Sequence, residues 1–224
     1  MTERSFWDWD WVFDHLGLIG DRLLQHLTLT GIAVGVGLAI SFPLAVLAHR
    51  HPRLYPPTAW ATGILYTIPS LALFSLLLPF TGLSILTAEI GLVSYTLLIL
   101  IRNIVTGLAG VPEDVKEAAH GMGYTERQLL WRVELPLALP AVVAGLRIAT
   151  VTTIGLVTVT ALIGKGGLGA LMLGGFRRLY PEIMIVVGLG LSVALALAFD
   201  ALILAAQRGL TPWSSSGRRR PVAG

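Results

Sequence analysis

Residues 117–136 read EAAHGMGYTERQLLWRVELP, and this polar stretch interrupts a chain that otherwise consists of long apolar segments. Hydrophobic residues make up 54% of the 224 residues, charged residues make up 13%, and the mean hydropathy is +0.76. These values lie outside the range of ordinary soluble domains, so a lipid bilayer is the expected solvent. A membrane protein that keeps such a stretch between its spans is expected to use it for a partner.

Five apolar windows are long enough to cross a hydrocarbon core of roughly 30 Å, for which a helix needs about 20 residues. They cover residues 27–48, 58–80, 83–101, 138–163 and 183–207. The sequence therefore predicts an all-α membrane protein with five transmembrane helices. Three prolines, Pro43, Pro69 and Pro79, are expected to bend or interrupt the first two spans. Gly31 and Gly35 form a small-xxx-small pattern that predicts a close helix contact.

Positive charges set the expected orientation, because cytoplasmic connections of membrane proteins carry an excess of Lys and Arg. If the connection after the third window is inside, the inner segments hold ten such residues: Arg50, Arg53, Arg102, Lys116, Arg127, Arg132, Arg208, Arg218, Arg219 and Arg220. The outer segments then hold five: Arg4, Arg22, Lys165, Arg177 and Arg178. The distribution predicts a multi-pass protein with its N-terminus outside and its C-terminus inside, to which Arg177 and Arg178 are a mild exception.

Both ends of the chain are expected to lie outside the transmembrane domain at residues 27–212. Residues 1–26 are interpreted as an external or interfacial segment, in which Trp7, Trp9 and Trp11 suit the headgroup level. This segment lacks the positive start of a signal peptide, so we expect it to be retained. Residues 213–224 include SSSGRRRP and are interpreted as a cytoplasmic basic tail that is attracted to anionic membrane lipid.

The polar stretch begins as a short helix. Pro112 fits a first helical position, and Glu113 and Asp114 place negative charge at the positive end of the helix dipole. Four apolar side chains then share one face at helical spacing: Val115, Ala118, Ala119 and Met122. Gly121 or Gly123 is expected to end this helix, because either can adopt the positive φ that is common at helix C-termini.

A second helix is expected after the turn. Thr125 and Gln128 form a capping-box pattern, and Pro136 falls where the fourth apolar window is about to begin. The first helix is so short that it is marginal alone in water, because few hydrogen bonds offset its nucleation cost. We therefore expect the loop at residues 103–136 to lie against another protein or, on composition alone, against the membrane surface.

The spacing within this loop resembles the cytoplasmic EAA loop of ABC-importer permeases. The family pattern is Glu-Ala-Ala, three residues, Gly, nine residues, an aliphatic residue, any residue and Leu-Pro. The matching positions are Glu117, Ala118, Ala119, Gly123, Val133, Leu135 and Pro136, and the one departure is Val133, where the family most often has Ile. The resemblance implies a type I importer permease whose loop is a coupling helix-turn-helix that docks onto a separate ATPase subunit. ATP and Mg²⁺ would bind to that subunit, so this chain is expected to be no enzyme and to carry no cofactor.

Three further segments resemble permeases of glycine betaine, carnitine and choline importers: TIPSLALFSLLLPF at residues 67–80, LIRN at 100–103 and GKGGLGALMLGG at 164–175. The resemblance covers residues 27–212 and implies a permease that moves an osmoprotectant across the cytoplasmic membrane of a prokaryote. It implies as partners ABC ATPase subunits, a second permease in a homodimer or heterodimer, and an extracytoplasmic substrate-binding protein, and no nucleic acid. Two alternatives stay open, a permease for methionine or an oxyanion and a non-transport membrane scaffold.

Three ionisable residues, Glu89, Arg147 and Asp200, fall inside apolar windows, where each is costly unless it is paired or hydrated. At about 1.5 Å per residue, Arg147 lies roughly 13 Å from the cytoplasmic start of its window and Asp200 roughly 10 Å from the cytoplasmic end of its own. Because the depths match, we expect the two residues to approach each other or to share a polar cavity, either as a structural ion pair or as part of the translocation path. Glu89 is expected to bond a neighbouring helix or to line that path. Five threonines of the fourth window fit either packing or a hydrated passage: Thr150, Thr152, Thr153, Thr158 and Thr160.

Other patterns that can signal chemistry are weak in this chain. Residues 164–169 read GKGGLG and satisfy G-x-G-x-x-G, but a membrane span rather than a strand is expected before them, which disfavours a dinucleotide site. The chain has no Cys, and its five His show no paired metal spacing, so neither a thiolate site nor a metal centre is expected. His49 and His51 flank Arg50 and are interpreted as an interfacial basic turn. A membrane-embedded enzyme is disfavoured because no cluster of catalytic groups falls at one depth.

Overall fold

The computed structural model describes residues 9–176 and 181–211, and the regular structure in these residues is helical. Within these described ranges, four helices are long and apolar enough to cross a membrane: α2 (Leu16–Arg50), α5 (Ile85–Ala109), the continuous helix Glu126–Ile163 that contains α8 (Leu135–Val159), and α10 (Pro181–Leu210). The helices α3 (Tyr55–Thr67) and α4 (Ser70–Thr81) make a fifth crossing if the bent pair is one span. The all-α architecture predicted from the sequence is confirmed.

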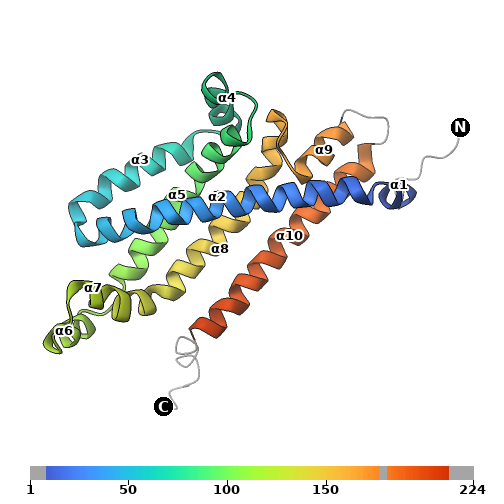
Figure 1. Cartoon of the computed structure of the whole chain (residues 1–224). Helices are drawn as coiled ribbons and strands as arrows, with labels where there is room; N and C mark the ends of the chain where they lie inside the picture. The colour runs from blue at the N-terminus through green and yellow to red at the C-terminus, as the bar shows by residue number, and fades with distance from the viewer. Residues whose placement is uncertain (1–8, 177–180, 212–224) are drawn as a thin grey trace, which may run out of the picture.

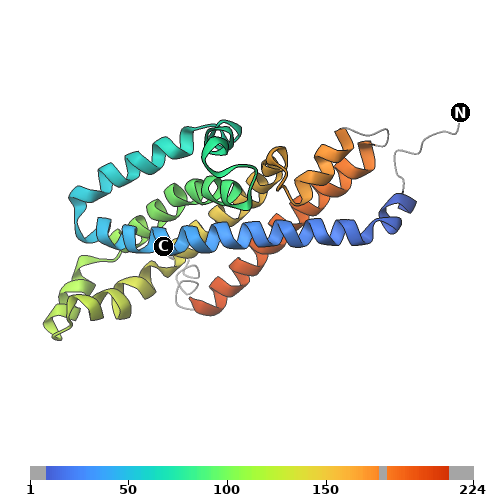
Figure 2. The ribbon, with the colours of Figure 1, turned by 45° about the horizontal axis from the view of Figure 1, so that its top comes forward.

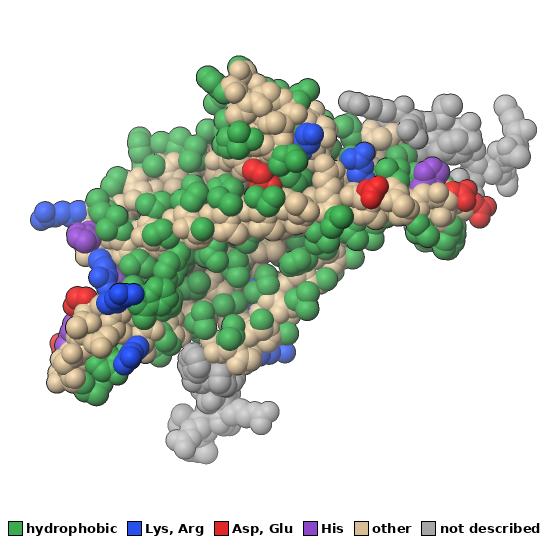
Figure 3. Space-filling model, in the orientation of Figure 1, with side chains coloured by type: hydrophobic (Ala, Val, Ile, Leu, Met, Phe, Trp, Pro, Cys, Tyr) green, Lys and Arg blue, Asp and Glu red, His purple; other side chains and the backbone are tan. Residues whose placement is uncertain are grey.

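The helices form an elongated bundle with two polar ends. In Figure 1, α2 runs along the bundle, and it contacts α5, α8 and α9 (Leu168–Phe176). The helices α6 (Glu113–Gly121) and α7 (Glu126–Leu129) project at one end, whereas α1 (Trp9–Asp14) and α9 lie toward the other (Figure 2). Figure 3 shows that most of the charged and His side chains on this face gather toward the same two ends. Such an apolar band between polar ends is the surface expected of a membrane-spanning chain.

Close helix contacts depend on small residues on the buried faces. At Gly37 of α2 a Cβ atom would lie 1.9 Å from Thr96 Oγ1 of α5, so only glycine lets these two helices approach this far. Gly31 and Gly35 instead face open space, with no atom within 4 Å of an added Cβ. The prediction of a contact at Gly31 and Gly35 is therefore wrong within this chain. The reason is that residues 31–40 of α2 are apolar on all sides, so the sequence there does not indicate which side meets α5.

The second apolar window is broken rather than straight. The helices on either side of the break, Pro52–Thr67 and Ser70–Thr81, are bent by 95°. Pro69 lacks a backbone N–H, and Ile68 before it has an extended conformation with φ −65° and ψ 125°, which a residue before proline favours. The Tyr95 hydroxyl on α5 donates a hydrogen bond to the Ile68 carbonyl oxygen at the break. The predicted interruption at Pro69 is confirmed, while Pro43 and Pro79 lie inside α2 and α4.

Helix boundaries differ from the windows in two places. The helix α2 begins at Leu16, so the predicted boundary at residue 26 falls inside a helix. The helix α5 continues to Ala109, so the first part of the loop predicted at residues 103–136 belongs to a span. Of the predicted interfacial tryptophans, Trp9 is exposed and Trp11 stacks on His15 with ring centroids 4.4 Å apart. Trp7, Arg177, Arg178 and the basic tail at residues 213–224 lie outside the described residues.

The glycine-rich stretch after α8 packs tightly and leads into α9. A Cβ atom at Gly166 would lie 2.2 Å from the Ala161 backbone nitrogen, and at Gly169 it would lie 2.1 Å from the Thr158 carbonyl oxygen. Gly167 has φ +50° and lies against His26 of α2. Two of the three glycines that match the nucleotide-binding pattern, Gly166 and Gly169, therefore allow close packing, as the resemblance to permeases implied.

His26 joins three helices at this end of the bundle, although its sequence context gave no sign of a role. Its side chain is fully buried, and its Nδ1 accepts a hydrogen bond from the Leu168 N–H at 3.3 Å. Its Nε2 lies 3.1 Å from the Ile154 carbonyl oxygen, which can only accept. His26 therefore carries its proton on Nε2 and links α2 to α8 and α9 as a neutral imidazole.

Candidate functional site: the coupling loop and a polar pair between α8 and α10

The turn after α6 has the geometry of a Schellman motif, which closes a helix with a glycine in the left-handed conformation. Gly123 has φ +83°, and its N–H donates to the His120 carbonyl oxygen at 2.9 Å. The next N–H, of Tyr124, donates to the Ala119 carbonyl oxygen at 3.1 Å. The sequence left Gly121 and Gly123 as alternatives, and the structure selects Gly123 because Gly121 is still the last residue of α6.

The second helix begins with the predicted capping box. The Gln128 N–H donates to the Thr125 hydroxyl at 3.4 Å, and the Thr125 N–H donates to the Gln128 side-chain oxygen at 2.9 Å. These reciprocal bonds satisfy two backbone donors that a helix start leaves free. The helix α7 is thereby fixed directly after the turn at Gly123.

The return from the loop is one continuous helix with a π-helical turn at Leu130–Glu134. Pro136 follows this turn and cannot donate a helical hydrogen bond, and its ring would clash with the carbonyl of residue 132 in regular α-helix geometry. The Leu135 N–H bonds the Leu130 carbonyl oxygen five residues earlier, which widens the turn before the proline. Pro136 lies in the first turn of α8, just before the fourth apolar window as predicted, but the helix is already continuous from Glu126.

The residues of the EAA pattern divide into an exposed tip and a packed stem. Glu117, Ala118 and Gly123 are exposed, whereas Ala119 is buried with 2% of its surface accessible. Val133, Leu135 and Pro136 lie half-buried on the returning helix. The two alanines therefore do not form one outward ridge, because neighbouring helical residues point about 100° apart.

The outward surface of the tip is small and mixed in character. It is made by residues on one side of α6 and just after it: Glu117, Ala118, Gly121 and Met122. Met122 is 68% exposed, and an added Cβ at Gly121 would meet nothing within 4 Å. Glu117 makes no hydrogen bond or ion pair that is recorded among the described residues. An exposed apolar side chain beside a free carboxylate and two small residues suits contact with another protein.

The start of α6 is stabilised locally. Glu113 and Asp114 occupy its first turn, as predicted, but Pro112 is the residue before the helix rather than its first member. The Lys116 ammonium lies 2.8 Å from the Glu113 carboxylate. Its hydrogen bond and positive charge hold the pKa of Glu113 below the ordinary value.

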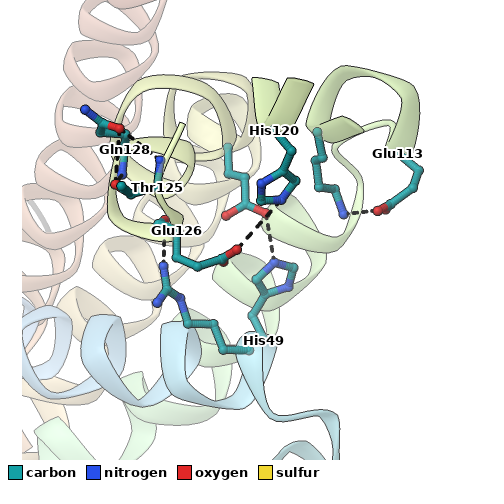
Figure 4. A network of polar contacts seen from close by, with 9 residues as sticks. His49, Glu113, His120, Thr125, Glu126 and Gln128 are labelled. Atoms are coloured by element: carbon teal, nitrogen blue, oxygen red, sulfur yellow. Dashed lines mark hydrogen bonds and ion pairs between the residues drawn. The ribbon is translucent and has the colours of Figure 1, made fainter. Parts of the chain in front are cut away.

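The loop is attached to the C-terminal end of α2 by polar contacts that sequence reasoning missed (Figure 4). His49 Nε2 lies 3.3 Å from the carboxylate of Glu134, whose side chain is only 7% exposed. The Arg50 guanidinium donates to the Glu126 carbonyl oxygen at 2.8 Å, and the Glu126 carboxylate lies 3.7 Å from His120 across the turn. The basic residues that were interpreted as an interfacial turn therefore connect the first span to the loop.

A second polar feature lies between α8 and α10, where the ion pair predicted from matching depths is present. Arg147 Nε and Nη2 donate to the two carboxylate oxygens of Asp200 at 2.8 and 2.7 Å. The side chains are 28% and 36% exposed, so the pair faces the outside of this single chain. The two groups satisfy each other in a bidentate arrangement, which is the geometry that Arg adopts with carboxylates.

Glu89 and three of the five threonines of the fourth window are buried between helices, whereas the other two threonines are only half-buried. Both carboxylate oxygens of Glu89 are buried without a hydrogen-bond partner, so the predicted bond to a neighbouring helix is absent among the described residues. Three threonines are buried in helix packing: Thr150, Thr153 and Thr160. Thr152 and Thr158 are half-buried on the open side of α8 that carries Arg147. Packing therefore explains only part of the threonine content.

A comparison with protein families matches residues 28–211 to the family described as binding-protein-dependent transport system inner membrane component. The chain belongs to this family. The matched region begins within α2 and ends after α10, so it includes the coupling loop and the Arg147–Asp200 pair. Membership of this family agrees with the resemblance of the EAA spacing to ABC-importer permeases. The chain is therefore a multi-pass membrane component of a transport system.

Curated relatives within this family extend over nearly the whole chain. The osmoprotectant import permease protein OsmW of Salmonella typhimurium is 38% identical over 207 residues, which are 90% of this chain and 96% of that protein. The choline transport system permease protein OpuBB of Bacillus subtilis is 34% identical over 85% of this chain and 88% of its own length. A solved inward-facing structure of the MetNI methionine ABC transporter matches with a TM-score of 0.78 at 24% identity, over 88% of this chain and 98% of that one. At this identity the structural likeness shows the fold.

Proposed function

We propose that this family member is the permease subunit of an ABC importer for a small osmoprotectant such as glycine betaine, carnitine or choline. The observation that carries the proposal is the 38% identity to OsmW, which extends over 90% of this chain. The relatives named for choline and carnitine transport, at 34% and 35% identity, support the same class of cargo. Each of these solutes has a quaternary ammonium group.

The exposed tip of the coupling loop is proposed as the docking surface for the ATPase. The tip is small enough to enter a groove, and its exposed Glu117 and Met122 offer one charge and one apolar contact. ATP and Mg²⁺ bind to the ATPase subunits, and their closure on ATP moves the loop. The contacts from His49 and Arg50 transmit that movement to α2, and the continuous helix 126–163 transmits it to the core of the bundle.

Two further partners complete the proposed transport cycle. A single bundle of up to five spans cannot easily enclose a passage, so a second permease, in a homodimer or heterodimer, forms its other wall. An extracytoplasmic binding protein captures the cargo and releases it into this passage. Alternating exposure of the passage to the two sides of the membrane then moves the cargo inward.

Transport by the reconstituted complex tests this proposal directly. The permease, its ATPase and its binding protein are placed in vesicles, and uptake of radiolabelled glycine betaine, carnitine, choline and methionine is measured with and without ATP. We expect ATP-dependent uptake of at least one quaternary ammonium compound and none of methionine. Uptake of methionine alone would replace the proposed cargo, and a permease that retains no ATPase during purification would support a non-transport scaffold.

Cysteine labelling tests the proposed orientation, because the natural chain contains no Cys. Single variants His120→Cys, in the coupling loop, and Lys165→Cys, between α8 and α9, place one thiol at each end of the bundle. With the N-terminus outside and the C-terminus inside, a membrane-impermeant maleimide modifies Lys165→Cys from the outside and His120→Cys only after the cells are opened. The reverse pattern would place the coupling loop outside and exclude docking to a cytoplasmic ATPase.

A further inference from the structure

The side of α8 that faces away from the core is unusually polar for a membrane span. Ala144, Arg147, Ile148, Val151 and Thr152 follow one another at helical spacing and line a concavity together with Asp200 of α10. The concavity has a volume of about 360 Å³, which falls within the range of about 300–1,000 Å³ that small-molecule sites occupy. A guanidinium and a carboxylate therefore lie at the surface of this hollow.

The open side of α2 shows what a lipid-compatible surface looks like in the same chain. Between residues 32 and 47 its large exposed side chains recur at helical spacing and are all aliphatic: Ile32, Val36, Ile40, Leu44 and Leu47. The first three line a hollow together with Glu89 of α5, so Leu44 and Leu47 are the lipid-facing reference. A part-exposed Arg147–Asp200 pair on α8 is costly against hydrocarbon. The side of α8 is therefore expected to face water or a polar surface, whereas the side of α2 can face lipid.

We propose that the concavity between α8 and α10 is a transient binding site for a small zwitterion that carries a quaternary ammonium group and a carboxylate. The cargo carboxylate replaces Asp200 as acceptor for the Nε and Nη2 donors of Arg147, and the ammonium group lies against the freed Asp200 carboxylate. The two protein charges are already neutral as a pair, and they are neutral again when each faces the opposite charge of the cargo. No net charge has to enter the low-dielectric site.

The same geometry distinguishes zwitterions from simple cations. Choline has an ammonium group but no carboxylate, so its binding to Asp200 would leave the Arg147 guanidinium without an acceptor. A part-buried charged donor that loses its partner is unfavourable, which disfavours choline at this site. The inference rests on the proposed function and narrows its cargo to the glycine betaine and carnitine type.

Accessibility of single cysteines in the natural Cys-free chain tests the site. Val151→Cys on α8 and Leu44→Cys on α2 are matched, because the native side chains are 37% and 38% exposed. The complex is placed in vesicles without nucleotide or binding protein and treated with a charged, membrane-impermeant methanethiosulfonate. Because the bilayer core excludes a charged reagent, we expect Val151→Cys to react at least about tenfold faster than Leu44→Cys. Equal, slow reaction of both would mean that α8 faces lipid or a sealed protein contact and would overturn the site.

Protection by cargo tests the ligand class. Glycine betaine at high concentration should slow the modification of Val151→Cys, and choline at the same concentration and salt should slow it much less. Replacement of the pair by Arg147→Gln with Asp200→Asn keeps two hydrogen-bonding side chains of similar shape and should abolish the protection. Persistent protection in this double variant, or equal protection by choline, would refute the exchange. If Val151→Cys does not assemble, Ile148→Cys replaces it and is compared with the same Leu44→Cys control, with native exposures of 51% and 38%.

Uptake by the wild-type complex is measured in parallel, so that the two proposals fail separately. Uptake of glycine betaine together with an unreactive Val151→Cys overturns the site and leaves the proposed function standing. Absence of uptake of every quaternary ammonium compound overturns both. Receptor-stimulated ATPase activity of the double variant provides a further control: retained stimulation with lost uptake places the defect in the passage, and retained uptake gives the pair a structural role only.

Discussion

Gly123→Ala is the sharpest test of how the coupling loop keeps its shape. Gly123 has φ +83°, and an added Cβ would meet no atom within 4 Å, so lack of space does not disfavour a side chain here. The cost comes from the backbone, because an L-residue in the left-handed region is disfavoured by about 1–2 kcal/mol. That free energy lowers the population of the native turn, relative to other loop conformations, by up to roughly 5–30-fold.

Titration of the purified permease with its ATPase measures this effect. Because α6 is short and marginal, loss of the turn reduces the fraction of permease that can dock, and the apparent Kd for the ATPase should rise by up to roughly 5–30-fold. A series at this position separates backbone strain from side-chain size. Affinity should fall in the order Gly, Asn, Ala, Val, since Asn enters the left-handed region more readily than other residues and β-branched residues least.

Gly121→Ala is the matched control, two residues away on the same loop. Gly121 lies within α6 without a positive φ, and its added Cβ also meets nothing within 4 Å. Alanine in a helix is favoured over glycine by roughly 0.5–1 kcal/mol, so this variant should keep the conformation of the loop, and any loss of affinity in it reports the added methyl group on the docking surface. Higher affinity in Gly123→Ala than in Gly123→Asn, or full affinity in Gly123→Val, would refute the assignment of the turn to backbone conformation.

Three other substitutions test separate parts of the structure. Thr125→Ala removes the capping box and should destabilise the start of α7 by about 0.5–2 kcal/mol. Less ATPase subunit should then remain bound to the purified permease, and Thr125→Ser should restore the binding. Full ATPase binding by Thr125→Ala would argue against the cap. His49→Leu leaves the buried carboxylate of Glu134 without its partner and should lower the free energy of unfolding of the permease by about 1–3 kcal/mol. His49→Gln is the control, because its side-chain amide can still donate a hydrogen bond to Glu134. Equal free energies of unfolding in the two variants would show that the contact is unimportant. Gly169→Ala places a Cβ 2.1 Å from a backbone carbonyl oxygen and should prevent assembly of the helix bundle. Gly174→Ala should be tolerated, because its Cβ meets only the flexible end of a methionine side chain at 2.9 Å. Similar melting temperatures of the two variants would contradict the close packing at Gly169.

The position of the loop and the chemistry of its ends could be predicted from sequence because they depend on local rules. The capping box at Thr125 and Gln128 involves neighbouring backbone groups, so the residue types at these two positions are enough to predict the hydrogen bonds. A glycine at the end of a short amphipathic stretch predicts a positive φ, although two glycines were candidates. The Arg147–Asp200 contact was predictable for a different reason, since two opposite charges at matching depth in a bilayer have few other partners.

Family membership was also readable from sequence. The EAA spacing places seven residues at fixed separations across a loop, and the matched family covers residues 28–211. The mean hydropathy of +0.76 predicted the membrane class, and of the five apolar windows four correspond to candidate spans and the fifth to the bent pair α3 and α4. These properties follow from composition and spacing, which do not require knowledge of which helix contacts which.

Only the tertiary structure decided which side of each helix meets its neighbours. It placed Gly37 rather than Gly31 and Gly35 against α5, and it separated Ala118 at the exposed tip from Ala119 in the packed stem. It also set the 95° bend after α3 and connected His49 to Glu134, which are far apart in the sequence. The physical reason is that membrane helices are apolar on every side, so hydrophobic periodicity cannot mark the buried face. That face is selected by shape and by a few polar contacts between distant residues, and both exist only once the bundle has formed.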